Sequence, residues 1–169
     1  MRPRILRLKF TFTIFPPAPP YLPSFFGSAG RAHKDAAGAI ENANDTINCD
    51  VSANEERLKT EMHAEINPDM VMRRFLLCGQ IEALAVFING MSDQSLVSDF
   101  ILRQGIPERE LPNDAPLIEY VANNVFAMAE VKQETSWNTI KTAIMDGCTA
   151  VFIQGQTTAL TMDTRSWYI

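Results

Sequence analysis

The fold of this chain is decided by two apolar runs, Met70-Val-Met-Arg-Arg-Phe-Leu-Leu77 and Ile81-Glu-Ala-Leu-Ala-Val-Phe-Ile88, on either side of Cys78-Gly-Gln80. Runs of this length with a short glycine-containing connection predict two paired strands. The second run is apolar after Glu82, which is typical of a central strand covered on both faces. Asn89-Gly90 ends it. We therefore expect a sheet built outward from this hairpin.

A second hairpin is predicted near the C-terminus. Thr149-Ala-Val-Phe-Ile153 and Thr158-Ala-Leu-Thr-Met162 flank Gln154-Gly-Gln-Thr157, which contains the glycine that such a connection favours. Val131 to Glu134 has the composition of a short extra strand.

Helix signals fill the remaining sequence. A capping box at Ser52-Ala-Asn-Glu55 predicts a helix to about Ile66, and a cap at Ser92 or Asp93 predicts a second helix to about Gln104. Pro116 suits the start of a third helix over 116–130. Ser136 precedes a fourth helix over 137–146, which stops at Gly147. Strand pairs separated by helices predict an α/β or α+β fold, with a mixed sheet of four to five strands and helices packed on it.

Composition limits the classes of protein. The chain has 169 residues, 46% hydrophobic and 21% charged, which excludes a wholly disordered chain, a collagen-like repeat and a disulfide-dense miniprotein. No run approaches 18 apolar residues, so no membrane-spanning helix is predicted. The net charge of −5 makes a nucleic-acid partner a poor expectation.

Charge and proline divide the chain into two parts. The first 48 residues carry six basic and three acidic side chains, and six of the ten prolines fall within the first 23. The remaining 121 residues carry nine basic and seventeen acidic side chains. We expect a flexible, proline-rich basic arm over 1–48 and a compact acidic domain over 49–169. A cleaved signal segment and a docking arm are the alternatives for residues 1–48, although the apolar core before Pro16 is short for an export signal.

No group of residues carries an enzyme's chemistry. The three cysteines form no Cys-x-x-Cys pair, and their odd number fits reduced thiols in a cytosolic compartment. Cys148 follows a helix-ending glycine, where the negative end of the helix dipole disfavours a thiolate, so a dyad with His63 is disfavoured. No metal-ligand spacing and no nucleotide-binding glycine motif is present.

The cluster Asp163-Thr164-Arg165 predicts a strand-end turn or ion pair, and Arg73-Arg74 is a basic pair with at least one member facing solvent.

Several segments together resemble the soluble N-terminal domain of the A subunit of GerA-type spore germination receptors. They cover roughly 50–167 in the family's order and spacing. These segments are Asp69-Met-Val-Met-Arg-Arg-Phe75, Ala85-Val-Phe-Ile-Asn-Gly-Met91 with Asp93, Trp137 with Ala143-Ile144 and Gly147, Thr149-Ala-Val-Phe-Ile-Gln-Gly155, and Asp163-Thr-Arg-Ser-Trp167. The chain departs from the family at Gln154, where Asp is usual, and at Ser166, where Gly is usual.

The resemblance implies a non-enzymatic role in spore germination, without catalytic residues, cofactor or metal. It implies a full-length protein of the spore inner membrane, with this domain on the cytosolic side. It also implies B- and C-type partner subunits and self-association. In the family a membrane domain follows this domain, so the chain looks like a truncated member. The positions carried by the motifs are expected to be architectural or to make subunit contacts: Arg74, Asn89, Gly90, Met91, Asp93, Trp137, Gly147, Gly155, Asp163, Thr164, Arg165 and Trp167.

Two further hypotheses stay open. One is a small-molecule (germinant) binding domain, with Asn89, Gln154 and Arg165 at strand ends as candidate ligand contacts. The other is an enzyme that uses Cys148. We expect subunit assembly or signal relay to be the principal role.

Overall fold

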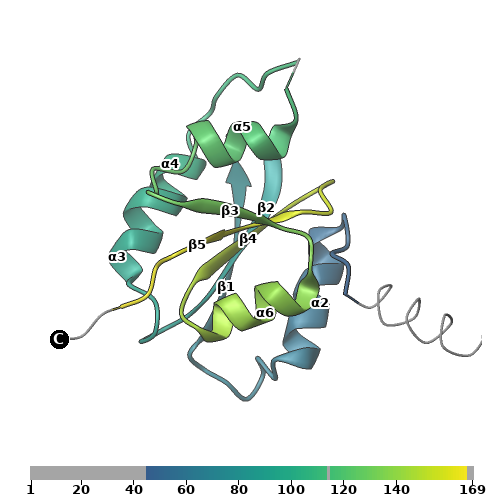
Figure 1. The fold of residues 1–169 in the computed structure, drawn as a ribbon, viewed down its shortest axis with the longest axis vertical. Coiled ribbons are helices and arrows are strands. Elements are labelled where there is room, and N and C mark those ends of the chain that lie inside the picture. Colours follow the sequence, from purple (N-terminus) through teal and green to yellow (C-terminus); the bar gives the residue numbers. More distant parts are fainter. Residues whose placement is uncertain (1–44, 114, 167–169) are drawn as a thin grey trace, which may run out of the picture.

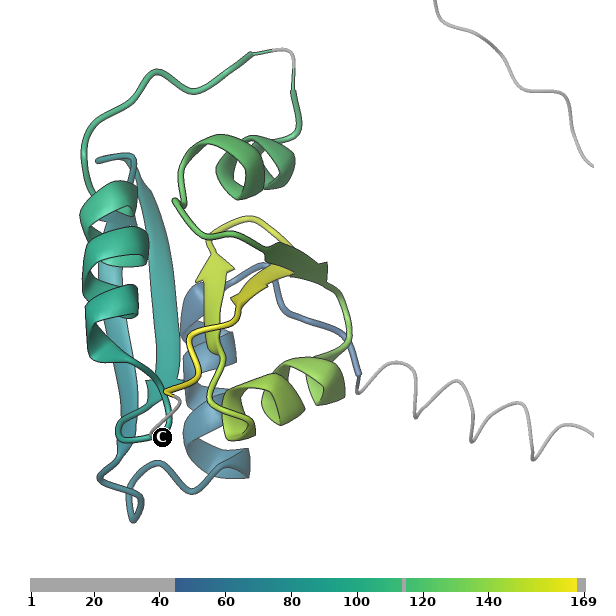
Figure 2. The same ribbon diagram turned by 60° about the vertical axis from the view of Figure 1, so that its left-hand side comes forward.

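The computed structural model describes residues 45–113 and 115–166, which form a five-stranded sheet with helices on both faces (Figures 1 and 2). The strand order is β1-β2-β4-β5-β3. The bounds are β1 Met70–Leu77, β2 Ile81–Ile88, β3 Val131–Glu134, β4 Thr149–Ile153 and β5 Ala159–Met162. The predicted bounds of the first four of these strands are confirmed, and β5 begins one residue later than predicted.

The predicted α+β class is confirmed, but the sheet is antiparallel at every pairing rather than mixed. The two hairpins account for β1–β2 and β4–β5. The chain then places β3 at the far edge, between two helices, and β4 returns beside β2 in the opposite direction. β3 and β4 are both antiparallel to β5 and therefore run parallel to each other, and the helix Trp137–Met145 forms the crossover between them.

The helices form two layers. One face of the sheet carries a helical segment made of α3 (Gln94–Leu96), the π-helix η1 (Val97–Leu102) and α4 (Arg103–Gly105), together with α5 (Leu117–Asn124). The other face carries α2 (Val51–Glu61) and α6 (Trp137–Met145) (Figure 1).

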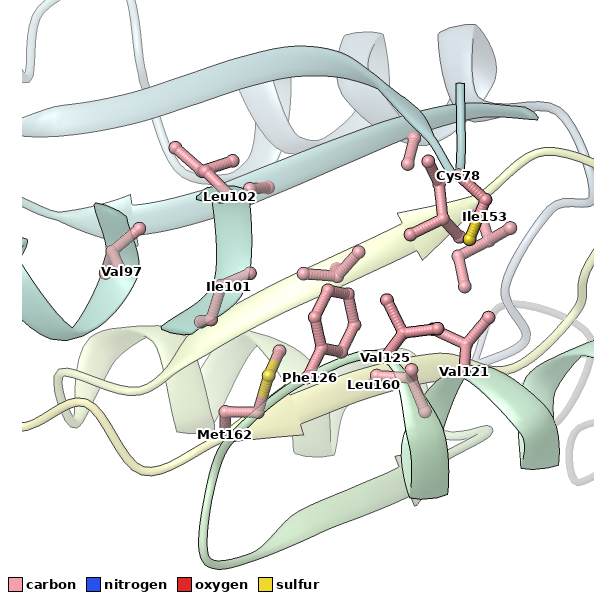
Figure 3. Packing of buried hydrophobic residues seen from close by; sticks show 14 of the residues in the cluster. Cys78, Val97, Ile101, Leu102, Val121, Val125, Phe126, Ile153, Leu160 and Met162 are labelled. Atoms are coloured by element: carbon pink, nitrogen blue, oxygen red, sulfur yellow. The ribbon is translucent and has the colours of Figure 1, made fainter. Parts of the chain in front are cut away.

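Each layer encloses its own apolar cluster. Figure 3 shows the first, in which Phe126 lies among Ile101, Val125 and Met162. The second is centred on Trp137, whose ring lies 5.9 Å from that of Phe152. Alternation along the strands assigns side chains to the two clusters, because successive strand residues point to opposite faces. β2 and β4 are thus buried on both faces, as predicted for the second apolar run.

The N-terminus of α2 corrects the predicted capping box. Asp50, not Ser52, is the N-cap, and its Oδ1 accepts from the Ser52 backbone N–H at 3.1 Å. The side chains of Ser52 and Glu55 instead both bind Arg74 on β1, at 3.1 and 2.6 Å. The cap therefore lies two residues earlier than predicted, and the predicted box residues join the helix to the sheet.

Three helices also end or wind differently from the prediction. α2 stops at Glu61 because His63 takes a left-handed conformation (φ 52), which leaves Ile66 80% exposed. In the helix after Asp93, residues 97–102 form a π-helical segment, in which the carbonyl of Phe100 also accepts from Ala127 N–H at 3.2 Å. α5 ends at Asn124, because Val125 and Phe126 turn into the core instead of extending the helix to 130.

Candidate functional site

Three motif segments that are far apart in sequence meet at one place, which we call the exit junction: residues 91–93, Gly147, Thr149 and residues 164–166. Ser92 Oγ donates to the carbonyl of Gly147 at 2.8 Å, and Thr164 Oγ1 donates to the same oxygen at 3.1 Å. Thr149 Oγ1 lies 2.8 Å from Thr164 Oγ1. Since the Thr164 proton is already used, the Thr149 hydroxyl is the donor in that pair.

Backbone hydrogen bonds complete the exit junction. Asp93 N–H donates to the Thr164 carbonyl at 2.6 Å, and Ser166 N–H donates to the Met91 carbonyl at 2.8 Å. Ser92 and Arg165 form an antiparallel bridge. Ser92, Thr149 and Thr164 are all buried. The last described segment of the chain is therefore fixed to the loop that leads from β2 into the π-containing helix.

Gly147 is required at the exit junction for two reasons. Its φ of 88° lies in the left-handed region, as predicted for the residue that ends α6. A Cβ at this position would also lie 2.8 Å from the Met91 carbonyl oxygen and 3.2 Å from Cγ of Arg165. The close approach of these two segments thus depends on the missing side chain.

Asp93 is the helix cap of this region. Its Oδ1 accepts from the backbone N–H groups of Ser95 and Leu96 at 2.8 and 3.3 Å, which resolves the predicted choice between Ser92 and Asp93. Asn89 and Gly90 are exposed just before it, and Asn89 Oδ1 accepts from Gln94 Nε2.

Asp163 and Arg165 form the expected strand-end ion pair. Arg165 Nε donates to Asp163 Oδ1 at 2.8 Å, and Nη2 donates to Oδ2. The hydrogen bond from Arg165 lowers the pKa of the Asp163 carboxyl below its usual range, against a smaller opposing effect of burial. Both side chains are partly exposed, so this pair contributes little to stability by itself.

A polar groove of about 520 Å³ runs beside this ion pair, between α6 and the β3–β5 edge of the sheet. One wall carries Glu130, Lys132 and Glu134, and the other carries hydroxyl and amide side chains of α6. Its residues are Glu130, Lys132, Glu134, Asn138, Thr139, Thr142, Ala143, Asp146, Cys148, Thr161, Met162, Asp163 and Arg165. Formal charges on these side chains give two cations and four anions, so the groove is acidic.

The predicted ligand contacts do not lie together in the structure. Arg165 lines the groove, whereas Asn89 and Gln154 do not. Gln154 lies at the opposite end of β4, where its Oε1 accepts from Val51 N–H at 2.9 Å at the start of α2. Gly155 follows with φ 82, and its N–H donates to the Cys49 carbonyl at 2.8 Å. The unusual glutamine thus anchors a helix, a role that its position in the hairpin did not indicate.

Cys148 and His63 line separate hollows and form no dyad. Burial raises the pKa of the Cys148 thiol, and the carboxylate of Asp163 raises it further. Both effects disfavour the thiolate that a nucleophile requires. Among the described residues, no three His, Cys, Asp or Glu side chains are grouped to hold a metal ion.

One further cluster, around Trp137, was not indicated by any sequence pattern. The Arg57 guanidinium lies 4.1 Å from the Trp137 ring centroid, and Glu61 accepts hydrogen bonds from Arg57, Trp137 and Lys141. Partial burial raises the pKa of Glu61, but these three hydrogen bonds outweigh it and lower the pKa to about 2. The partners lie up to 80 residues apart in sequence, so no local pattern could have indicated the cluster.

Two predictions concern residues outside the described ranges. Trp167 lies beyond Ser166, and the proposed arm lies almost wholly before Asp45. Asp45 itself is well fixed: its carboxylate accepts from Ser136 Oγ at 2.9 Å and from Asn138 N–H at 2.8 Å. Within the described ranges, no helix has both the length and the apolar character to cross a membrane.

Comparison with known proteins identifies the family. The family model described as Bacillus/Clostridium GerA spore germination protein matches residues 56–168, about two thirds of the chain. The chain belongs to the GerA family. The resemblance expected over roughly 50–167 is thereby confirmed, with a family match over 56–168.

Two relatives show what part of a GerA protein this is. Spore germination protein GerLA of Bacillus cereus is 28% identical over 100 residues, which cover 59% of this chain and 20% of that protein. The crystal structure of the N-terminal domain of the A subunit of the Bacillus megaterium spore germinant receptor GerK3 matches with a TM-score of 0.53 at 21% identity, over 72% of this chain and 49% of that one. The chain therefore has the fold of an A-subunit N-terminal domain and spans about a fifth of the curated relative's length.

Proposed function

We propose that this GerA-family domain is a non-enzymatic assembly and signal-relay module of a germinant receptor A subunit. The exit junction is the observation that carries the proposal. It fixes residues 164–166 to the β2–α3 loop and to the end of α6 through buried hydroxyl and backbone hydrogen bonds. A displacement at residue 166 would pass to both helical layers, because α3 begins and α6 ends at this junction.

The family membership supports the rest of the proposal. In GerLA of Bacillus cereus, the matched region covers 20% of the chain, so most of that protein lies outside it. We place the full-length protein in the spore inner membrane with this domain on the cytosolic side, in contact with B- and C-type subunits and with further copies of itself. The reduced state expected of the cysteines agrees with this side of the membrane.

Co-expression with B- and C-type receptor subunits tests the proposal. We expect the 169-residue chain to co-purify with a tagged subunit from membranes. Thr164→Val should weaken recovery, because it breaks the buried hydroxyl network, while the exposed Thr142→Val should leave recovery unchanged. A folded chain that binds neither subunit and is strictly monomeric would contradict the proposal.

The polar groove favours a second candidate function, binding of a hydrophilic small molecule. Its volume of about 520 Å³ lies within the range of ligand pockets, and its lining of hydroxyls and charges suits a polar ligand. Amino acids and sugars should then raise the unfolding temperature of the chain, and Lys132→Ala together with Thr139→Ala should abolish the rise. Absence of any shift at millimolar ligand would exclude this candidate.

A further inference from the structure

We propose that Asn89 is a site of spontaneous deamidation. The backbone nitrogen of Gly90 attacks the side-chain amide of Asn89, and the amide nitrogen is lost. The products are aspartate and isoaspartate at position 89. This proposal concerns the turn that leads into the exit junction and does not depend on the proposed receptor function.

The geometry leaves the reacting atoms accessible. Asn89 and Gly90 are the central residues of the turn from Ile88 to Met91, closed by a hydrogen bond from Met91 N–H to the Ile88 carbonyl at 3.2 Å. Both are exposed, and nothing lies within 4 Å of the position that a Gly90 Cβ would occupy. Over the described part of the chain, the Gly90 N–H makes no hydrogen bond of ordinary geometry, and an isolated bridge between Asn89 and Ser92 spans the turn. The nucleophilic nitrogen is thus exposed and only weakly held.

The side-chain carbonyl of Asn89 is also polarised. Its Oδ1 accepts a hydrogen bond from Gln94 Nε2, which draws electron density away from Cγ. The Gly90 nitrogen loses its proton to hydroxide and forms a bond to Cγ. The Cγ–Nδ2 bond then breaks, and ammonia leaves with a proton from water. Water next opens the cyclic imide at either carbonyl, so no oxidant or reductant is needed.

The chain contains an internal comparison, the Asp146-Gly147 pair, which can form the same imide by loss of water. Gly147 is buried, its N–H donates to the Ile144 carbonyl at 3.0 Å, and its Cα faces the Met91 carbonyl. Attack by this nitrogen requires opening of the α6 terminus and of the exit junction. The structure therefore predicts reaction at position 89 and protection at position 146.

Modification at position 89 would act on the exit junction. Isoaspartate adds a methylene to the main chain two residues before Met91, whose carbonyl holds Ser166 N–H. The new carboxylate would also lie close in sequence to Asp93, the helix cap. We expect an aged chain to unfold at a lower temperature than a fresh one.

Peptide mapping of the intact chain tests the proposal. The chain is incubated at mildly alkaline pH, folded or in urea, and samples taken over time are compared with a zero-time digest. Trypsin separates the two sites into peptides 75–103 and 142–165. We expect the rate at Asn89 in the folded chain to stay within about threefold of its rate in urea, and isomerisation at Asp146 to be at least about tenfold slower in the folded chain than in urea. Equal suppression of both sites on folding would overturn the proposal.

A conservative variant assigns the site. Asn89→Gln keeps an amide and its hydrogen-bonding groups but must close a larger ring, so conversion within peptide 75–103 should stop. Asn89→Asp reproduces one product and should show whether charge alone lowers the unfolding temperature. Continued conversion of peptide 75–103 in Asn89→Gln would also overturn the assignment, since the remaining amides there are Gln80 and Gln94.

Discussion

The indole Nε1–H of the fully buried Trp137 donates to Oε2 of Glu61 at 2.9 Å, which joins the first residue of α6 to the last residue of α2. Arg57 and Lys141 also bind Glu61, so one carboxylate holds three partners from two helices. The Glu61 carboxylate therefore joins the two helices on this face. The sequence of neither helix alone indicates that a charged residue is needed at this position.

The cluster around Trp137 should make the free energy of unfolding depend on pH, through the ionisation of Glu61. The pKa of Glu61 is lowered to about 2 in the folded chain from an ordinary 4.5, so the ionised form stabilises the fold above about pH 4.5 and this contribution is lost as pH falls toward 2. Glu61 is partly solvated, so we expect Glu61→Gln to cost only about 1 kcal/mol at neutral pH. Urea unfolding of both proteins between neutral pH and about pH 2 measures the difference, which should vanish at the acid end. A difference independent of pH would contradict this assignment.

Two glycines with the same backbone conformation should differ in their tolerance of alanine. Gly147 and Gly155 have φ of 88° and 82°, but only at Gly147 would a Cβ meet other atoms, at 2.8 Å from the Met91 carbonyl oxygen. Gly155→Ala should cost about 1 kcal/mol from backbone strain alone. Gly147→Ala should cost clearly more, because the exit junction must also shift. Chemical denaturation measures both, and equal losses would show that the close approach is unimportant.

The N-terminus of α2 should be sensitive at Asp50 rather than at Ser52. Asp50 supplies the side-chain acceptor for the helix, so Asp50→Ala should cost about 1 kcal/mol. Ser52→Ala removes only an exposed hydrogen bond from Arg74 and should cost under about 0.5 kcal/mol. Thermal unfolding of the two variants distinguishes them. The reverse order would restore the capping box that the sequence predicted.

The strands were predictable from the sequence and the tertiary hydrogen bonds were not. The bounds of β1 and β2 follow from apolar runs with turn residues between them, and in β2 burial on both faces reinforces this local signal. Asp50 and Ser52 are both good caps, and only the path of the preceding residues decides between them. The end of α5 was missed because packing of Phe126 into the core overrides continuation of the helix.

The candidate site was predictable in its residues but not in its arrangement. Gly147, Thr164 and Arg165 were singled out by resemblance, yet the shared carbonyl that binds both Ser92 and Thr164 exists only in the folded chain. Gln154 is a candidate ligand contact by its place at a strand end, but its side chain binds Val51, 103 residues away in the sequence. Interactions of this kind are set by the sheet order, which single-sequence patterns do not determine.

Loss of one buried hydroxyl should weaken the exit junction. Thr164→Val keeps the shape of the side chain but leaves the Thr149 hydroxyl without its partner in a buried site. An unsatisfied buried polar group costs about 1–3 kcal/mol, so a loss of stability in that range is expected. Thr142→Val, on the exposed face of α6, is the matched control and should stay within about 0.5 kcal/mol of the parent. Similar losses in both variants would argue against a buried hydroxyl network.

The three cysteines should react with a thiol reagent in the order Cys49, Cys148, Cys78. Cys49 is exposed, Cys148 is half-buried in the groove, and Cys78 is fully buried beneath α4. Burial raises the pKa of both Cys78 and Cys148, which lowers the fraction of reactive thiolate at neutral pH. Mass spectrometry of the folded chain during labelling gives the order, and urea should bring the three rates together. Preferential labelling of Cys148 over Cys49 would reveal an activated thiol in the groove and would reopen the enzyme hypothesis.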